Sequence, residues 1–281
     1  AMNSHSPFII SNLQTEILYG NRTICGKEWG LNGIEVYNDP FSRLYWVESG
    51  SGEINFLSGE RYELIPGRLF VIPEHNPARY RTNEKMILYW IHFKARIFGI
   101  LELFSATGWQ RNVEINRNSR MKYFWNQLLR LQNPGNISDL LKADAMLRQL
   151  LANFATEFSG GLEHNQLSML ERLKPAIEFI ERNLHRNIKL KDLTELVPLQ
   201  EAYFCNLFSR TIGISPIEFI NRKKVEKAQF LLLQTDSRLK EIAFNIGIKD
   251  VYYFSRLFKK LTGISPSCYR LQKEHREIEQ Q

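Results

Sequence analysis

Histidine and cysteine residues are the first candidates for metal or redox chemistry in this chain. His75 and His92 are seventeen residues apart, the chain contains no His-x-His pair, and no set of three ligands emerges from the spacing. Cys25, Cys205 and Cys268 are far apart and odd in number, which fits neither a disulfide framework nor a zinc site. We therefore expect reduced thiols, no metal, no cofactor and no enzyme activity.

A second set of candidate residues lies in a segment that the chain contains twice. Residues 203–216 and 253–266 are identical at eight of fourteen positions, at an offset of 50. In each copy a Phe, a Leu and a Phe recur at i, i+3 and i+4, which fixes one face of a helix to a core. The opposite face is left for another partner and carries Ala202, Cys205 and Asn206 in the first copy, and Val251, Tyr252, Ser255 and Arg256 in the second.

Turn and capping residues indicate how the two copies are held. Gly213 and Gly263 can adopt the left-handed conformation that ends a helix, and each is followed by a Ser-Pro pair that caps and begins the next. A further short helix precedes each copy, and Ala243 and Gly247 suit the close crossing and tight turn between two helices. Two helix-turn-helix units result. We expect helices at 167–185, 189–197, 201–211, 216–233, 238–246, 250–261 and 266–277.

The second unit resembles the signature of AraC/XylS-type transcription regulators through the run Ile242-Ala243-x3-Gly247-Ile248-x-Asp250-x2-Tyr253-Phe254-x3-Phe258-Lys259-Lys260-x2-Gly263-x-Ser265-Pro266-x2-Tyr269-Arg270. The resemblance extends through most of residues 168–277. Ile248 stands where the signature has Phe, and Thr194 and Pro198 replace the small residue and the turn glycine of the first unit. The resemblance implies a regulator that binds double-stranded DNA, forms a homodimer and contacts RNA polymerase.

The resemblance also assigns roles to individual residues. In such regulators two recognition helices enter successive major grooves, and the seven residues on the two outward faces correspond to base-reading positions. Asn206 suits adenine, Arg256 suits guanine, and the apolar Ala202 and Val251 suit thymine methyl groups. Phosphate contacts are expected from Arg210, Arg222, Lys259 and Lys260.

Charge and length agree with such a protein. The net charge is +7, and residues 168–281 hold 20 Lys and Arg against 14 Asp and Glu, so most of the excess lies in the C-terminal part. That asymmetry indicates a polyanionic partner. No run of eighteen apolar residues and no secretory signal is present, so we expect a cytoplasmic protein without a membrane segment. A length of 281 residues accommodates two domains.

The N-terminal part predicts an antiparallel β-sandwich or barrel. Short apolar or alternating runs separated by Gly and Pro fill residues 8–95. Residues 41–93 resemble a cupin-like effector domain through the Gly50-Ser-Gly52 turn, the strand around residues 64–73, and Trp90-Ile-His92-Phe. Trp90 falls where arabinose-type regulators place a tryptophan that stacks on a sugar. We expect a small polar effector such as a sugar, bound by Arg43, Tyr45, His75, Trp90 and His92.

Helical spacing is expected in the segment that follows, at residues 96–104, 121–131 and 137–158. The apolar stripe of 137–158 either packs on the β domain or forms half of an antiparallel dimer contact. The whole is an α+β protein with an effector domain (1–95), a helical dimerisation segment (96–159), a linker (160–166) and a DNA-binding domain (167–281). Two alternatives remain, a cupin-type enzyme and a DNA-binding protein that needs no effector.

Overall fold

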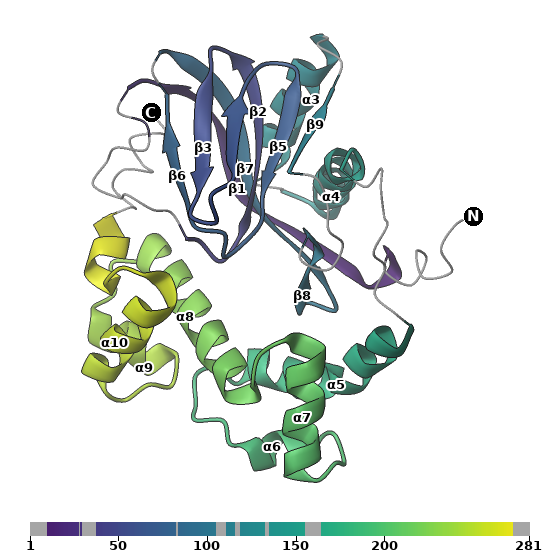
Figure 1. Cartoon of the computed structure of the whole chain (residues 1–281), viewed down its shortest axis with the longest axis vertical. Coiled ribbons are helices and arrows are strands. Elements are labelled where there is room, and N and C mark those ends of the chain that lie inside the picture. The colour runs from purple at the N-terminus through teal and green to yellow at the C-terminus, as the bar shows by residue number, and fades with distance from the viewer. Residues whose placement is uncertain are drawn as a thin grey trace. The chain divides into compact units, whose positions relative to one another are not determined.

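The computed structural model describes residues 10–27, 29, 38–82, 84–104, 111–115, 119–132, 135–154 and 164–271. These residues divide into two compact units, one N-terminal to residue 155 and one from residue 164 onward. Antiparallel sheets lie in the first and helices make up the second (Figure 1), which confirms the α+β class. Most of the predicted linker at 160–166 falls outside the described residues, and its last three residues already belong to a helix.

Two antiparallel sheets form the N-terminal unit among the residues described. The larger sheet has the order β1 (Leu13–Cys25), β7 (Met86–Ile97), β2 (Ser42–Ser49), β5 (Arg68–Ile72), β9 (Asn112–Glu114), with β8 (Leu101–Glu102) paired to β7. The smaller sheet has the order β4 (Arg61–Leu64), β3 (Gly52–Phe56), β6 (Ala78–Arg81). The predicted barrel is therefore present as two separate sheets rather than one closed cylinder.

A shared apolar core joins the two sheets. Tyr45 and Trp90 of the larger sheet belong to the same buried cluster as Ile54, Phe56 and Tyr80 of the smaller one. Because successive side chains of a strand alternate between its faces, the residues at every second position of β2 and β7 enter this core. The inner face of the larger sheet is thus fixed by the alternation seen in the sequence.

The helix predicted at residues 96–104 is wrong for residues 96–102, and only residues 103 and 104 are helical. Strand β7 continues to Ile97, and β8 pairs back onto it through Leu101 and Glu102. Nearly all residues of β7 are buried, on both faces of the sheet. A strand buried on both faces carries no polar alternation, so its apolar residues also match helical spacing.

Among the residues described, the N-terminal unit also contains α3 (Ser119–Leu131) and α4 (Ile137–Ala152). Helix α4 packs on β1 and α3 through the buried Leu147, Leu150 and Leu151, as one of the two interpretations of its stripe predicted. Arg148 Nη2 donates a hydrogen bond to the Leu13 carbonyl at 2.9 Å. The first turns of α4 expose Ile137, Leu140 and Leu141 instead.

The C-terminal unit contains α5 (His164–Arg182), α6 (Leu190–Thr194), α7 (Glu201–Ile212), α8 (Pro216–Gln234), α9 (Leu239–Asn245) and α10 (Val251–Thr262). Residues 266–271 are also helical, and the predicted continuation to 277 lies outside the described residues. Helix α8 runs from the α6–α7 pair to the α9–α10 pair (Figure 1). No helix within the described residues is long and apolar enough to cross a bilayer.

Candidate nucleic-acid interface and effector site

Helix α7 presents the first candidate DNA-reading face. Phe204, Leu207 and Phe208 are buried, as their spacing predicted, and the Phe208 ring lies edge-on to Phe219 at 5.4 Å between ring centroids. With that face fixed, the opposite side of α7 points outward. It carries the exposed Ala202 and Asn206 and the half-buried Cys205. Burial raises the pKa of the Cys205 thiol, with a smaller contribution from Glu201, so the sulfur stays protonated and uncharged near neutral pH.

Helix α10 repeats this arrangement in the second unit. Phe254, Leu257 and Phe258 are buried, and the Phe258 ring lies edge-on to Tyr269 at 5.5 Å. The outward face carries Tyr252, which is 77% exposed, with the exposed Arg256 and the half-buried Val251 and Ser255. The Ser255 hydroxyl donates to the Val251 carbonyl at 2.9 Å. Hydroxyl and apolar groups therefore flank one aromatic and one cationic side chain.

Capping residues set where the two recognition helices begin and end. Asp250 accepts hydrogen bonds from the backbone amides of Tyr252 and Tyr253 at 2.8 and 3.2 Å, which fixes the first turn of α10. Gly213 and Gly263 end α7 and α10 with φ angles of 84° and 86°, the left-handed conformation expected from the sequence. Ser215 caps α8 through the Glu218 amide at 3.2 Å.

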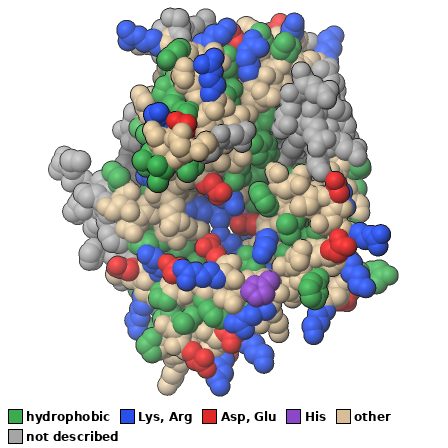
Figure 2. Space-filling view, turned by 180° about the vertical axis from the view of Figure 1, so that it is seen from behind, with side chains coloured by type: hydrophobic (Ala, Val, Ile, Leu, Met, Phe, Trp, Pro, Cys, Tyr) green, Lys and Arg blue, Asp and Glu red, His purple; other side chains and the backbone are tan. Residues whose placement is uncertain are grey.

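Basic side chains surround the outward faces. Arg210, Arg256, Lys259 and Lys260 are exposed and form no ion pair with any residue that the structure describes. Arg222 differs, because its guanidinium pairs with Glu218 one turn earlier in α8 at 2.8 Å. Its charge is already compensated, which weakens its candidacy as a phosphate contact. Figure 2 shows Lys and Arg side chains distributed over the helical unit, in the lower part of the view.

Two exposed tyrosines were not assigned a role from the sequence. Tyr203 and Tyr253 occupy the same position in the two repeats and are 54% and 44% exposed. Their identity at the offset of 50 was the available signal, because the other shared residues of the repeat are core, cap or turn residues. They extend the outward faces of α7 and α10 by one large aromatic side chain each.

The candidate effector residues lie mostly on two paired strands. Arg43 and Tyr45 of β2 stand opposite His92 and Trp90 of β7. All four side chains are at least nine-tenths buried. Their cross-strand pairing places them on the inner face of the larger sheet, as strand alternation predicted. The Trp90 indole donates to Thr23 Oγ1 at 2.9 Å, and its ring contacts the His92 imidazole at 4.6 Å between centroids.

A buried polar group lies beside these aromatic rings. The Arg43 guanidinium pairs with the Asp39 carboxylate and donates to the Tyr80 hydroxyl at 2.7 Å. Burial raises the pKa of Tyr80 although the arginine charge acts in the opposite direction, so the phenol stays protonated and can donate a hydrogen bond. Asp39 and Tyr80 were not found from the sequence. Alternation along β6 was the only signal for Tyr80, and Asp39 precedes β2 without any pattern.

His75 lies at the surface beside this group. Its backbone amide donates to the Asp39 carbonyl at 2.9 Å, but its imidazole is exposed and its φ is 56°. Tyr19 joins this group, with its ring 4.6 Å from His92 and 5.7 Å from Trp90. Among the described residues, no three His, Cys, Asp or Glu side chains gather as metal ligands would.

Comparisons with known proteins agree with this geometry. A family model described as a helix-turn-helix domain matches residues 193–272. The chain is 27% identical over 230 residues to the arabinose operon regulatory protein of Salmonella typhimurium, across 79% of this chain and 80% of that protein. It is 24% identical to the lactose operon transcription activator of Staphylococcus xylosus and 21% identical to the raffinose operon transcriptional regulatory protein of Pediococcus pentosaceus, each across 92% of this chain and 94% of the relative.

A solved structure shares the fold of both units. ToxT from Vibrio cholerae, determined with an unsaturated fatty acid bound, aligns with a TM-score of 0.52 at 14% identity and covers 92% of this chain and 93% of that one. Two repeated helix-turn-helix units, each with a buried aromatic face and an outward polar face, stand on a sequence that matches regulators of transcription over most of its length. Residues 193–272 thus form a helix-turn-helix domain, and the chain is similar over most of its length to DNA-binding transcription regulators of the AraC/XylS type.

Proposed function

We propose that this regulator reads two successive major grooves on one face of the DNA, α7 entering the first and α10 the second. The observation that carries the proposal is the repeat itself, which exposes the same helix face twice on one compact unit. The two helices have the same buried residues but different outward residues, so each can read a different base sequence. Ala202, Cys205 and Asn206 would read the first, and Val251, Tyr252, Ser255 and Arg256 the second.

The four basic residues would have different roles on DNA because their neighbouring side chains differ. Arg210, Lys259 and Lys260 lie near the C-terminal ends of α7 and α10, exposed to solvent and without ion pairs to described residues. They would contact phosphate and position the protein without specifying sequence. Arg222 would have to leave Glu218 to do the same.

Selection of DNA by the full chain tests the proposal. Duplexes with a random central segment are bound to the protein, recovered, amplified and sequenced. We expect enrichment of two short boxes whose centres lie about one helical turn, 10–10.5 base pairs, apart. Variants Asn206→Ala and Arg256→Ala should each relax one box and leave the other unchanged. Enrichment of a single box, or of no sequence, would contradict two-groove binding.

We further propose that a small polar effector, such as a sugar, binds on the inner face of the larger sheet. Arg43, Asp39 and Tyr80 supply ionic and hydroxyl groups inside an apolar core, and Trp90 supplies a ring of the kind that stacks on sugar C–H groups. Three relatives are named for arabinose, lactose and raffinose operons. Binding there would shift the populations of arrangements that the protein adopts on DNA.

Thermal denaturation of the full chain tests the effector. Arabinose, lactose, raffinose and an unsaturated fatty acid are titrated separately, the last because the structure of ToxT contains one. A ligand at a hundred times its Kd adds about 2.7 kcal/mol of stability. We expect one sugar to raise Tm in proportion to the logarithm of its concentration, and Arg43→Met to abolish that rise. If no compound raises Tm, the alternative of an effector-independent DNA-binding protein is favoured.

Dimerisation and contact with RNA polymerase complete the proposal. Ile137, Leu140 and Leu141 form an exposed apolar patch on the first turns of α4, with exposed fractions of 75%, 55% and 65%. Apolar side chains at that exposure suit an antiparallel contact with a second copy, in which the same patch faces itself. A dimer would place four recognition helices on one operator.

A further inference from the structure

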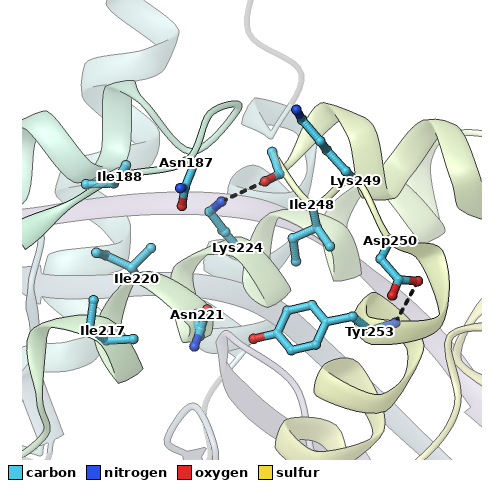
Figure 3. Close-up of a pocket in the computed structure, with 11 residues that line it drawn as sticks. Asn187, Ile188, Ile217, Ile220, Asn221, Lys224, Ile248, Lys249, Asp250 and Tyr253 are labelled. Carbon is cyan, nitrogen blue, oxygen red and sulfur yellow. Dashed lines mark hydrogen bonds between the residues drawn. The ribbon is translucent and has the colours of Figure 1, made fainter.

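Lys224 occupies an unusual place for a lysine in a DNA-binding unit. It lies in the middle of α8, is only 5% exposed, and extends its ammonium to two backbone carbonyls. Lys224 Nζ donates to the Arg186 carbonyl at 3.0 Å and to the Gly247 carbonyl at 3.3 Å. Figure 3 shows the second of these bonds as a dashed line. Burial lowers the pKa of Lys224, because removal from water disfavours the charged ammonium.

The two carbonyls belong to different helix-turn-helix units. Arg186 follows α5 and precedes α6 in the first unit, whereas Gly247 is the turn between α9 and α10 in the second. One side chain on the connecting helix therefore bonds the backbone of both units. Its hydrogen bonds join the segment just before α6 to the turn just before α10.

The two backbones also approach each other closely at this joint. A Cβ placed on Gly247 would lie 2.7 Å from the N, C and O atoms of Arg186, so only glycine allows the approach. The φ of Gly247 is 66°, which side chains other than glycine rarely adopt. The contact thus requires the absence of a side chain at 247, and Lys224 donates hydrogen bonds to the backbone on both sides of it.

Side-chain packing does not fill the space beside the joint. A hollow of about 380 Å³ lies there, lined by Asn187 and Ile188 of the first unit, by Asn221 of α8, and by Ile248 and Tyr253 of the second (Figure 3). A hollow transmits no packing force from one wall to the other. Helix α8 packs into the core of the second unit through Val225, Ala228 and Leu232, and beside the hollow the two Lys224 bonds are the directional contacts between the units.

We propose that Lys224 is a positioning residue that fixes α7 and α10 relative to each other and so selects the spacing between the two DNA boxes. This rests on the proposed two-groove binding. Helix α8 has 19 residues and spans about 28 Å, close to the length of about 34 Å of one DNA turn. One inserted base pair rotates the second box by about 34° and moves it about 3.4 Å. A rigid joint cannot follow such a shift, whereas a loosened joint can.

Lys223 supplies a matched control. It is also a lysine on α8 and is only 6% exposed, but its ammonium pairs with Glu181 of α5 at 3.3 Å and with Glu226 of α8 at 3.7 Å. Among the described residues its ion pairs stay within the first unit and α8. Lys223→Met therefore removes a buried ammonium without touching the joint, and Lys224→Met removes the two hydrogen bonds across the joint. Lys224→Arg keeps donors for both carbonyls.

The experiment uses the full chain and three duplexes. The boxes selected by the wild-type protein are placed at their selected spacing, one base pair closer and one base pair farther, and Kd is measured for each. We expect the wild type and Lys223→Met to lose about tenfold or more at the altered spacings. Lys224→Met should vary less than about threefold across the three duplexes, and Lys224→Arg should restore most of the discrimination. If Lys224→Met does not melt cooperatively, Lys224→Gln takes its place.

Each other outcome counts against the proposal. Equal weakening on all three duplexes, with the spacing ratio unchanged, would show that Lys224 only supports folding. An unchanged ratio with unchanged affinity would show that packing alone sets the joint. If the wild-type protein selects no pair of boxes, two-groove binding is wrong and the role proposed for Lys224 is wrong with it. This result is distinguishable from the first two because it is seen with the wild-type protein alone.

Discussion

Replacing Arg256 with alanine is the sharpest test of base reading by the second unit. Its guanidinium is exposed on the outward face of α10 and forms no ion pair with any described residue. Truncation therefore removes no folding contact of note, and the free energy of unfolding should change by less than about 0.5 kcal/mol. The loss on DNA should be larger, since a bidentate arginine to guanine contact contributes about 1–3 kcal/mol. That range corresponds to about 5- to 150-fold in Kd.

Lys259 is the matched comparison because it lies about one turn later on the same helix and is also exposed. Both variants are titrated against the selected duplex and a shuffled duplex by fluorescence anisotropy, at several salt concentrations. Arg256→Ala should weaken the selected duplex far more than the shuffled one. Lys259→Ala should weaken both alike and reduce the slope of log K against log salt by about one.

The result that would refute this assignment is an equal loss on both duplexes for Arg256→Ala. The side chain would then act as a phosphate contact, and base reading by α10 would have to come from Tyr252 or Tyr253. Circular dichroism melting of both variants excludes unfolding as the cause.

Three further predictions concern stability and assembly. Asp250→Ala removes the cap of α10 and should cost about 1 kcal/mol in urea unfolding, whereas Asp250→Asn should cost little, and an equal cost for both would contradict a capping role. Hydrogen bonds from Arg81 and Arg61 lower the pKa of Glu53 to about 2 from 4.5, so its stabilising contribution is present above about pH 4.5 and is lost as pH falls towards 2. The stability difference between wild type and Glu53→Gln should accordingly shrink over that window in denaturant titrations, and a constant difference would disprove the linkage. Leu141→Glu should shift sedimentation towards monomer without changing the circular dichroism spectrum, and an unaltered sedimentation profile would remove the α4 patch from the dimer contact.

The double helix-turn-helix part could be predicted from the sequence because its constraints are local. Helix periodicity, capping Ser-Pro pairs and left-handed glycines act within a few residues of one another, and the repeat presents each of them twice. The buried Phe204 and Phe258 followed from spacing alone. Long-range placement did not follow, as with the exposed imidazole of His75, whose position depends on a left-handed backbone after β5.

Buried charges were the least predictable feature. The pair Lys223-Lys224 looks in sequence like a solvated or DNA-facing cationic site, yet both side chains are buried. Their partners are a carboxylate of α5 and two backbone carbonyls, which no spacing rule connects to α8. Asp39 and Tyr80 could not be predicted for the same reason. Their ion pair and hydrogen bond with Arg43 form only when the two sheets face each other.

Under the proposed two-groove binding, the single continuous helix α8 makes its residue count a determinant of function. Each residue added to an α-helix turns everything beyond it by about 100° and advances it by about 1.5 Å. If α7 holds DNA as proposed, one alanine inserted in the exposed face of α8 would therefore turn α10 away from that DNA, although every side chain of both units would be intact. Seven inserted residues make almost two whole turns and restore the orientation of α10 to within about 20°. The distance between α7 and α10 along α8 would then be about 10 Å greater. Length variation among relatives should consequently be confined to the loops that flank α8.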